Sequence, residues 1–133
     1  MRVAARALAG GAGEGVSIRL SAPLSFWGGT DSRGRIVDAH HPQCGALLAG
    51  RVVVMESGRG SSSSSSVLAE QIRTKAAPAA IVLARPDAIV ALAAIVAREL
   101  YGLDVPIVVV ATPHHEQIPA GVLVRVDSTA VMW

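Results

Sequence analysis

The sequence predicts an α/β fold in which a partly parallel, mixed sheet carries flanking helices. Two observations support this prediction. The first third of the chain is rich in short strands and turns, whereas the remainder alternates apolar strands with amphipathic helical segments. Alternation of this kind brings strands side by side in parallel, with the helices packed over them. A length of 133 residues is enough for one domain and too short for two.

The composition excludes several classes of protein. With 51% hydrophobic and 17% charged residues, the chain can bury a core and is not intrinsically disordered. A net charge of +2 is too small to indicate a nucleic-acid partner. The longest apolar run covers residues 88–97, about half of what a membrane span needs. The single cysteine, Cys44, excludes an internal disulfide, is expected to be a small buried hydrophobe, and fits a cytoplasmic location.

The first half of the chain predicts short elements joined by turns. Residues 1–14 form an Ala/Gly-rich stretch that we expect to be a flexible arm, followed by a single domain over residues 15–133. Alternation of apolar and polar residues predicts a half-buried strand over residues 16–20 and a second short strand over 35–38. Residues 39–45 are expected to form a loop.

The second half predicts longer elements. The helix that begins after Pro86 has Asp87 as a suitable N-cap and Gly102 as a C-terminal stop. The apolar spacing of Leu68 and Ile72 indicates a helix over residues 67–73. Apolar β-branched runs predict strands over residues 50–55, 79–84, 106–110 and 122–126, with a loop over 112–119 and a short tail over 127–133.

The most informative segment is Ser57 to Ser66, which contains Gly-Arg-Gly followed by six serines. It could be a Ser-rich linker, or the serines could simply cap a helix. However, it joins a buried strand directly to a helix, and ligands bind at such junctions in α/β sheets. The helix N-terminus and Arg59 would stabilise an anionic serine or a bound carboxylate or phosphate. The segment lacks the spacing of a P-loop.

Other candidate residues carry weaker signals. Trp27, Gly28 and Gly29 suit either the core or a surface approached by another chain or a ligand. The pairs His40–His41 and His114–His115 lack the i, i+4 spacing of a chelating motif, and no second cysteine supports a His/Cys site. We therefore expect hydrogen-bonding loop histidines and no metal bound by this chain.

Several motifs together resemble the small, swivel-domain subunit of the aconitase X family. They are Leu24-Ser25-Phe26-Trp27-Gly28-Gly29, Gly34-Arg35-Ile36-Val37-Asp38, His40-His41-Pro42 and Ser57-Gly58-Arg59-Gly60-Ser61. The segments Ala77 to Leu83 and Glu99 to Gly102 match as well. The similarity extends from about Ser17 to Val110, whereas we find no match before Gly15 or after Ala111.

The resemblance implies a swivelling β/β/α domain like the mobile fourth domain of aconitase. It also implies a much larger partner subunit that holds an iron or iron–sulfur centre and most of the substrate contacts. The first serine after the glycine, Ser61, matches the serine base of aconitases. Because the serines repeat, Ser62 and Ser63 stay as alternates. Arg59 and Gly60 would form the anion-stabilising turn, and Trp27, Gly28, Gly29, His40 and His41 would form the site rim or the subunit interface.

The resemblance implies a hydro-lyase that is active only with its large subunit. The family dehydrates small hydroxy acids, namely cis-3-hydroxy-L-proline in bacteria and mevalonate 5-phosphate in archaea. The Arg/Ala-rich composition is typical of a high-GC bacterial gene and favours the hydroxyproline reaction. A non-catalytic anion-binding or regulatory module on the same fold is the alternative from a different class.

Overall fold

The computed structural model describes residues 1–133 as one mixed sheet with helices. Its strands are β1 (Arg2–Ala4), β2 (Arg6–Ala9), β3 (Gly13–Arg19), β4 (Val52–Met55), β5 (Ala80–Leu83), β6 (Ile107–Val109), β7 (Leu123–Val126) and β8 (Ala130–Met132). Its helices are α1 (Phe26–Gly29), α2 (Ser63–Arg73), α3 (Ala88–Tyr101) and α4 (Thr112–Gln117). The predicted α/β class with a partly parallel sheet is confirmed.

The sheet has a parallel half and an antiparallel half. The strand order is β1-β8-β7-β3-β4-β5-β6-β2. Strands β3, β4, β5 and β6 pair in parallel, and the remaining pairs are antiparallel. The carboxyl ends of the four parallel strands therefore meet at one edge, where the serine segment leaves β4.

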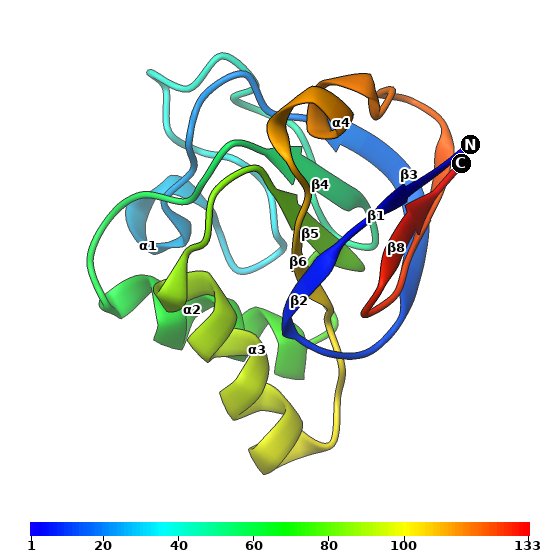
Figure 1. Cartoon of the computed structure of the whole chain (residues 1–133). Coiled ribbons are helices and arrows are strands. Elements are labelled where there is room, and N and C mark those ends of the chain that lie inside the picture. Colours follow the sequence, from blue (N-terminus) through cyan, green and yellow to red (C-terminus); the bar gives the residue numbers. More distant parts are fainter.

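The sheet is curled, because β1 and β2 lie at its opposite edges although Ala5 alone separates them in the sequence. A flat sheet of eight strands would hold those edges much farther apart than one residue can span. Figure 1 shows the two strands following one another across the mouth of the curl. It also shows the two termini side by side, where the N-terminal ammonium donates to the Trp133 carbonyl at 2.7 Å.

Two hydrophobic cores lie on the two faces of this sheet. Val53, Met55 and Ile81 belong to the core beneath α2 and α3. Their neighbours Val52, Val54 and Val82 belong to the core inside the curl. Because successive side chains of a strand point to opposite faces, β4 and β5 are buried on both sides, as their apolar sequences predict.

Helix α3 begins and ends where the sequence predicts. The Asp87 carboxylate accepts the backbone N–H groups of Ile89 and Val90, at 2.9 and 3.1 Å, which makes Asp87 the N-cap. Gly102 follows in the left-handed conformation, with φ of 64°. No helix in the structure has the length and apolar character needed to cross a membrane.

Five expectations about local structure are wrong. Residues 1–14 do not form a free arm, because β1 pairs with β8 and β2 pairs with β6. The predicted tail over 127–133 contains β8. The segment 35–38 makes only isolated bridges, and the predicted loop over 112–119 contains α4. Helix α2 also begins earlier than predicted, because the last four serines form its first turn.

Candidate functional site

The serine segment forms an exposed turn between β4 and α2. Ser61 lies just before the helix, and its Oγ accepts the backbone N–H of Ser63 at 3.3 Å. This N–H belongs to the first turn of an 11-residue helix, where free donors and the helix dipole favour negative charge. Among the serines, Ser61 is therefore the one whose hydroxyl oxygen receives a helix N-terminal donor.

The alternates Ser62 and Ser63 are exposed and lie at the same end of the helix. Ser62 occupies the N-cap position, yet its hydroxyl caps no backbone group. Arg59 is exposed next to the turn and forms no ion pair within the chain. Its backbone N–H donates to the Leu24 carbonyl at 3.0 Å, which fixes where the turn begins. The guanidinium of Arg59 is thus free to meet an anion at this surface.

Residues 24–31, which we call the Trp27 segment, lie beside the serine turn, as Figure 1 shows for α1 and the start of α2. Trp27 is 60% exposed, whereas the preceding Phe26 is 1% exposed and belongs to the core. Gly28 has φ of 78° and open space where a side chain would point. The segment therefore holds one aromatic ring in the core and presents the next to solvent. Gly29, in contrast, is buried.

The two histidines of the 39–45 loop have different surroundings. His41 is 5% exposed, and its Nδ1 accepts the N–H of Gln43 at 3.0 Å. Its Nε2 lies 3.0 Å from the Ala22 carbonyl and must therefore carry the proton. His41 thus ties this loop to the segment before Trp27 and is not free for a ligand. His40 is exposed, whereas Cys44, expected in the core, is exposed instead.

A groove of about 360 Å³ opens at the carboxyl ends of the parallel strands. Arg19 crosses it and donates from Nη2 to the carbonyls of His115 and Ile118, both at 2.7 Å. Ser61 does not line this groove. The candidate base lies instead at the exposed turn before α2.

His115 is buried at the floor of this groove, where its Nε2 lies 3.0 Å from the Met55 carbonyl and 3.2 Å from the Val82 carbonyl. Burial is the main cause that lowers the pKa of His115 below its ordinary value, and the charge of Arg19 lowers it further. The lowered pKa favours the neutral form of this histidine in the folded chain. The sequence predicts a loop at this position, whereas the structure places His115 in α4.

This lowered pKa predicts that the fold loses stability in acid. Because the pKa of His115 is lower in the folded chain than in the unfolded chain, the unfolded chain binds this proton more readily as the pH falls through about 6.5, and the free energy of unfolding falls with it. Urea unfolding at pH 7.5 and pH 5.0 measures the effect. His115→Gln should flatten the dependence in this range, whereas the exposed control His114→Gln should leave it unchanged. An equal flattening by both variants would contradict the assignment.

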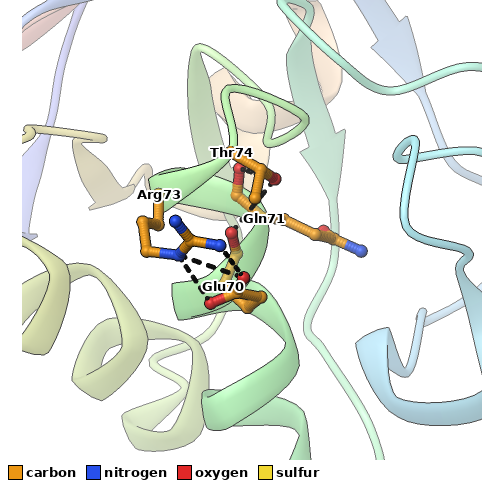
Figure 2. A network of polar contacts seen from close by, with 4 residues as sticks. All are labelled: Glu70, Gln71, Arg73 and Thr74. Atoms are coloured by element: carbon orange, nitrogen blue, oxygen red, sulfur yellow. Dashed lines mark hydrogen bonds and ion pairs between the residues drawn. The ribbon is translucent and has the colours of Figure 1, made fainter.

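The residues of this chain do not assemble a metal site. No group of three or more His, Cys, Asp or Glu side chains lies close enough together to hold an ion. Glu70 pairs with Arg73 on the surface of α2, while the next residue, Gln71, extends away from that pair (Figure 2).

Comparisons with known proteins identify the family. The model of the aconitase X swivel domain matches residues 2–132. This chain belongs to the aconitase X swivel-domain family. The match also includes residues 2–14 and 112–132, for which sequence analysis found no resemblance.

Similar proteins include enzymes and enzyme subunits. The chain is 48% identical over 103 residues to cis-3-hydroxy-L-proline dehydratase of Pseudomonas aeruginosa, covering 77% of this chain and 18% of that protein. It is 33% identical over 131 residues to the phosphomevalonate dehydratase small subunit of Thermococcus kodakarensis, covering 96% of this chain and 91% of that subunit. The chain thus spans about a fifth of the dehydratase relatives from Pseudomonas aeruginosa and Hypocrea jecorina.

A solved structure confirms the fold. The crystal structure of holo-form aconitase X from Thermococcus kodakaraensis superposes with a TM-score of 0.85 at 32% identity, covering 98% of this chain and 96% of that chain. A solution structure of a UPF0107 protein also gives a TM-score of 0.85, at 29% identity, covering 99% of this chain and 98% of that one. The curled mixed sheet with parallel strand pairs and helices is therefore the swivel-domain architecture of this family.

Sequence analysis missed two residues that shape the site. Ser64 is 3% exposed and contacts the Trp27 segment, whereas the other serines of the run are partly or fully exposed. Its inward position could have been found from helical phase, because Ser64, Leu68 and Ile72 repeat every four residues. Ser25, which Ser64 contacts, had been noted only as part of a motif. No local signal marks it.

Proposed function

We propose that this chain is the small subunit of a heteromeric hydro-lyase that dehydrates cis-3-hydroxy-L-proline to Δ1-pyrroline-2-carboxylate. The observation that carries the proposal is the exposed Ser61 hydroxyl at the N-terminus of α2. The choice of substrate is supported by the 48% identity over 103 residues to cis-3-hydroxy-L-proline dehydratase of Pseudomonas aeruginosa. Its large partner subunit would complete the site.

Ser61 would act as the base that removes the proton from C2, the carbon next to the substrate carboxylate. A free serine is a poor base at neutral pH, so its alkoxide has to be stabilised. The Ser63 N–H at 3.3 Å, the dipole of α2 and the nearby Arg59 all favour negative charge at Ser61 Oγ. Ser62 and Ser63 are the alternates, since their hydroxyls are exposed at the same helix end.

Loss of the C2 proton leaves an electron pair that forms the C2–C3 double bond as the C3 hydroxyl departs. That hydroxyl takes up a proton and leaves as water, and the resulting enamine rearranges to the Δ1-imine. The iron or iron–sulfur centre that we assign to the large subunit would supply Lewis acidity to the departing hydroxyl. The side chains of this chain fit a role limited to base and anion binding, because they form no metal-ligand cluster.

Arg59 and the Gly60 turn would bind the substrate carboxylate. The Arg59 guanidinium has no ion-pair partner of its own and lies two residues before the base. Trp27 and Gly28 would contact the large subunit at the rim of the site, because a Trp that is 60% exposed is a suitable anchor for a protein interface. His40 is exposed and would also belong to this rim. Gly29 and His41 are buried, so they would support the rim without touching the partner.

A second candidate substrate is mevalonate 5-phosphate. It is favoured by the match to the phosphomevalonate dehydratase small subunit of Thermococcus kodakarensis. The matched region is 91% of that subunit's length. The same base would remove a proton next to a carboxylate. The phosphate would have to be bound elsewhere in the complex.

The test is an anaerobic dehydratase assay of this chain co-expressed with its large subunit. We expect turnover of cis-3-hydroxy-L-proline, little turnover of mevalonate 5-phosphate, and no activity from either subunit alone. Turnover of mevalonate 5-phosphate instead would reassign the substrate. Absence of both activities from a folded, iron-loaded complex would overturn the proposal, and anion binding by this chain alone would then favour a regulatory module.

A further inference from the structure

We propose that the hydroxyl groups of Ser25 and Ser64 form a clamp that positions the Gly60–Ser61 turn for catalysis. Both residues would be positioning residues that act through Ser61. The inference rests on the proposed function, which makes Ser61 the base. Its structural part can be measured without any enzyme assay.

The clamp is a closed ring of three hydrogen bonds, one within the Trp27 segment and two between that segment and α2. Ser25 Oγ donates to the Trp27 carbonyl at 2.8 Å, and the Trp27 N–H donates to Ser64 Oγ at 3.2 Å. The two hydroxyl oxygens lie 3.2 Å apart. Because the single Ser25 proton is given to the Trp27 carbonyl, Ser64 must be the donor within the pair. Every hydroxyl proton in the ring is thus assigned, and each oxygen accepts one bond.

Gly60 lies directly against this ring. Its φ of 102° is in the left-handed region, and a Cβ built on it would overlap Ser25 Oγ and lie 3.4 Å from Ser64 Oγ. The Gly60 backbone therefore lies so close to the two hydroxyls that a residue with a Cβ would clash with Ser25. Since Ser61 follows immediately, the ring limits the positions that the Ser61 hydroxyl can take.

Further contacts hold the two sides of the clamp in place. On one side, the Arg59 N–H donates to the Leu24 carbonyl at 3.0 Å. On the other, Gln71 reaches from α2 and donates from Nε2 to Thr30 Oγ1 at 2.8 Å and to the Asp31 carbonyl at 3.1 Å. Figure 2 shows Gln71 extending away from the Glu70–Arg73 pair. The Trp27 segment is thus tied to α2 near both its ends, and the ring is the tie nearest to the base.

The ring also separates the roles of the neighbouring serines. The Ser64 hydroxyl is buried, donates to Ser25 Oγ and accepts the Trp27 N–H, so it cannot serve as a base. Ser65 Oγ donates to the Ile89 carbonyl at 2.8 Å and joins α2 to the start of α3. Ser66 is exposed and makes no hydrogen bond through its side chain. The helix therefore offers matched controls in which the same hydroxyl is removed from positions outside the ring.

The structural test is amide hydrogen exchange on the full chain by NMR. In Ser64→Ala the Trp27 N–H loses its acceptor, and we expect its exchange and that of the Arg59 N–H to accelerate by about fivefold or more. Ser65→Ala removes a different hydrogen bond from the same helix and should leave both amides unchanged. Equal rates at Trp27 and Arg59 in wild type and Ser64→Ala would overturn the clamp.

The kinetic test uses the complex with its large subunit. We expect Ser64→Ala to lower kcat by about tenfold to a hundredfold with little change in KM, because the base is misplaced while substrate contacts stay. Ser25→Ala should have a similar effect, and the double variant should be no worse than either, since the two hydroxyls act as one unit. Ser65→Ala and Ser66→Ala should retain the wild-type kcat.

The outcomes separate this inference from the proposed function. If wild type is active and Ser61→Ala is not, but Ser64→Ala behaves like Ser66→Ala, the positioning role is wrong and the function stands. If wild type turns over neither substrate, the function is wrong, and the exchange rates still decide whether the ring holds the turn. Equal losses of kcat in Ser64→Ala and Ser65→Ala would indicate general destabilisation and would also overturn positioning.

Discussion

Replacing Ser61 with alanine is expected to lower kcat of the assembled complex by about a hundredfold to ten-thousandfold, the range that a positioned general base contributes. The variant removes the one hydroxyl oxygen that accepts the Ser63 N–H at the start of α2. It removes no other side-chain hydrogen bond, and Ser61 is exposed. Folding and assembly should therefore be retained. Steady-state kinetics with cis-3-hydroxy-L-proline, beside gel filtration of the complex, measure both.

The neighbouring serines provide the comparison. Ser66→Ala makes the same chemical change one turn further along the exposed side of α2 and should keep full activity. Ser62→Ala and Ser63→Ala should each cost far less than Ser61→Ala, because neither hydroxyl receives a helix N-terminal donor. Full activity in Ser61→Ala would contradict the assignment. A large loss in Ser62→Ala or Ser63→Ala would then identify the base.

The elements that sequence predicts well are those whose signals are local. Asp87 and Gly102 mark the two ends of α3 through hydrogen-bonding and backbone preferences that need no distant partner. The apolar runs of β4 and β5 require burial on both faces, and every residue of both strands is buried in the structure. The position of the serine turn follows from the same elements, because it lies between β4 and α2.

The parts that sequence did not predict depend on distant partners. Strands β1 and β2 are short. Strand β1 is held by β8 (Arg2 opposite Met132) and β2 is held by β6 (Arg6 opposite Val109), so both partners lie far away in the chain. Ala- and Gly-rich sequence carries little strand propensity, so the pairing alone decides their structure. Likewise, the role of Ser25 follows from its distance to Ser64, 39 residues away, and no local pattern encodes that distance.

The identical side chains of the serine run show how helical phase assigns different roles. Ser64 faces inward with Leu68 and Ile72, while Ser61 precedes the helix and stays exposed. Six equal residues thus divide into a base, its alternates, a clamp residue, a helix–helix contact and a free surface residue. Sequence predicted that this run carries function, but the division needs the rotation of α2 against the Trp27 segment.

Replacing Gly60 with alanine is expected to lower kcat by about a hundredfold while the chain still folds. An alanine Cβ would overlap Ser25 Oγ and lie 3.1 Å from the Ser25 Cβ. Rotating the Ser25 hydroxyl away would relieve the first overlap, but it would break the hydrogen bonds to the Trp27 carbonyl and to Ser64. The second contact would remain. The turn that carries Ser61 would therefore have to move, and a displacement of about 1 Å can cost a hundredfold in rate.

Gly45→Ala separates this steric effect from backbone strain. Gly45 has φ of 93°, close to that of Gly60, but nothing lies within 4 Å of the position of its Cβ. Both variants should lose similar stability from the left-handed conformation, about 1 to 2 kcal/mol, and thermal unfolding measures this. Of these two variants, only Gly60→Ala should lose kcat. Adding Ser25→Gly removes both clashing atoms, but kcat should rise no further than in Ser25→Ala, because the ring of hydrogen bonds stays broken. If Gly45→Ala lost kcat as severely as Gly60→Ala, strain alone would account for the effect. The contact between Gly60 and the Ser25 hydroxyl would then have no part in placing the base.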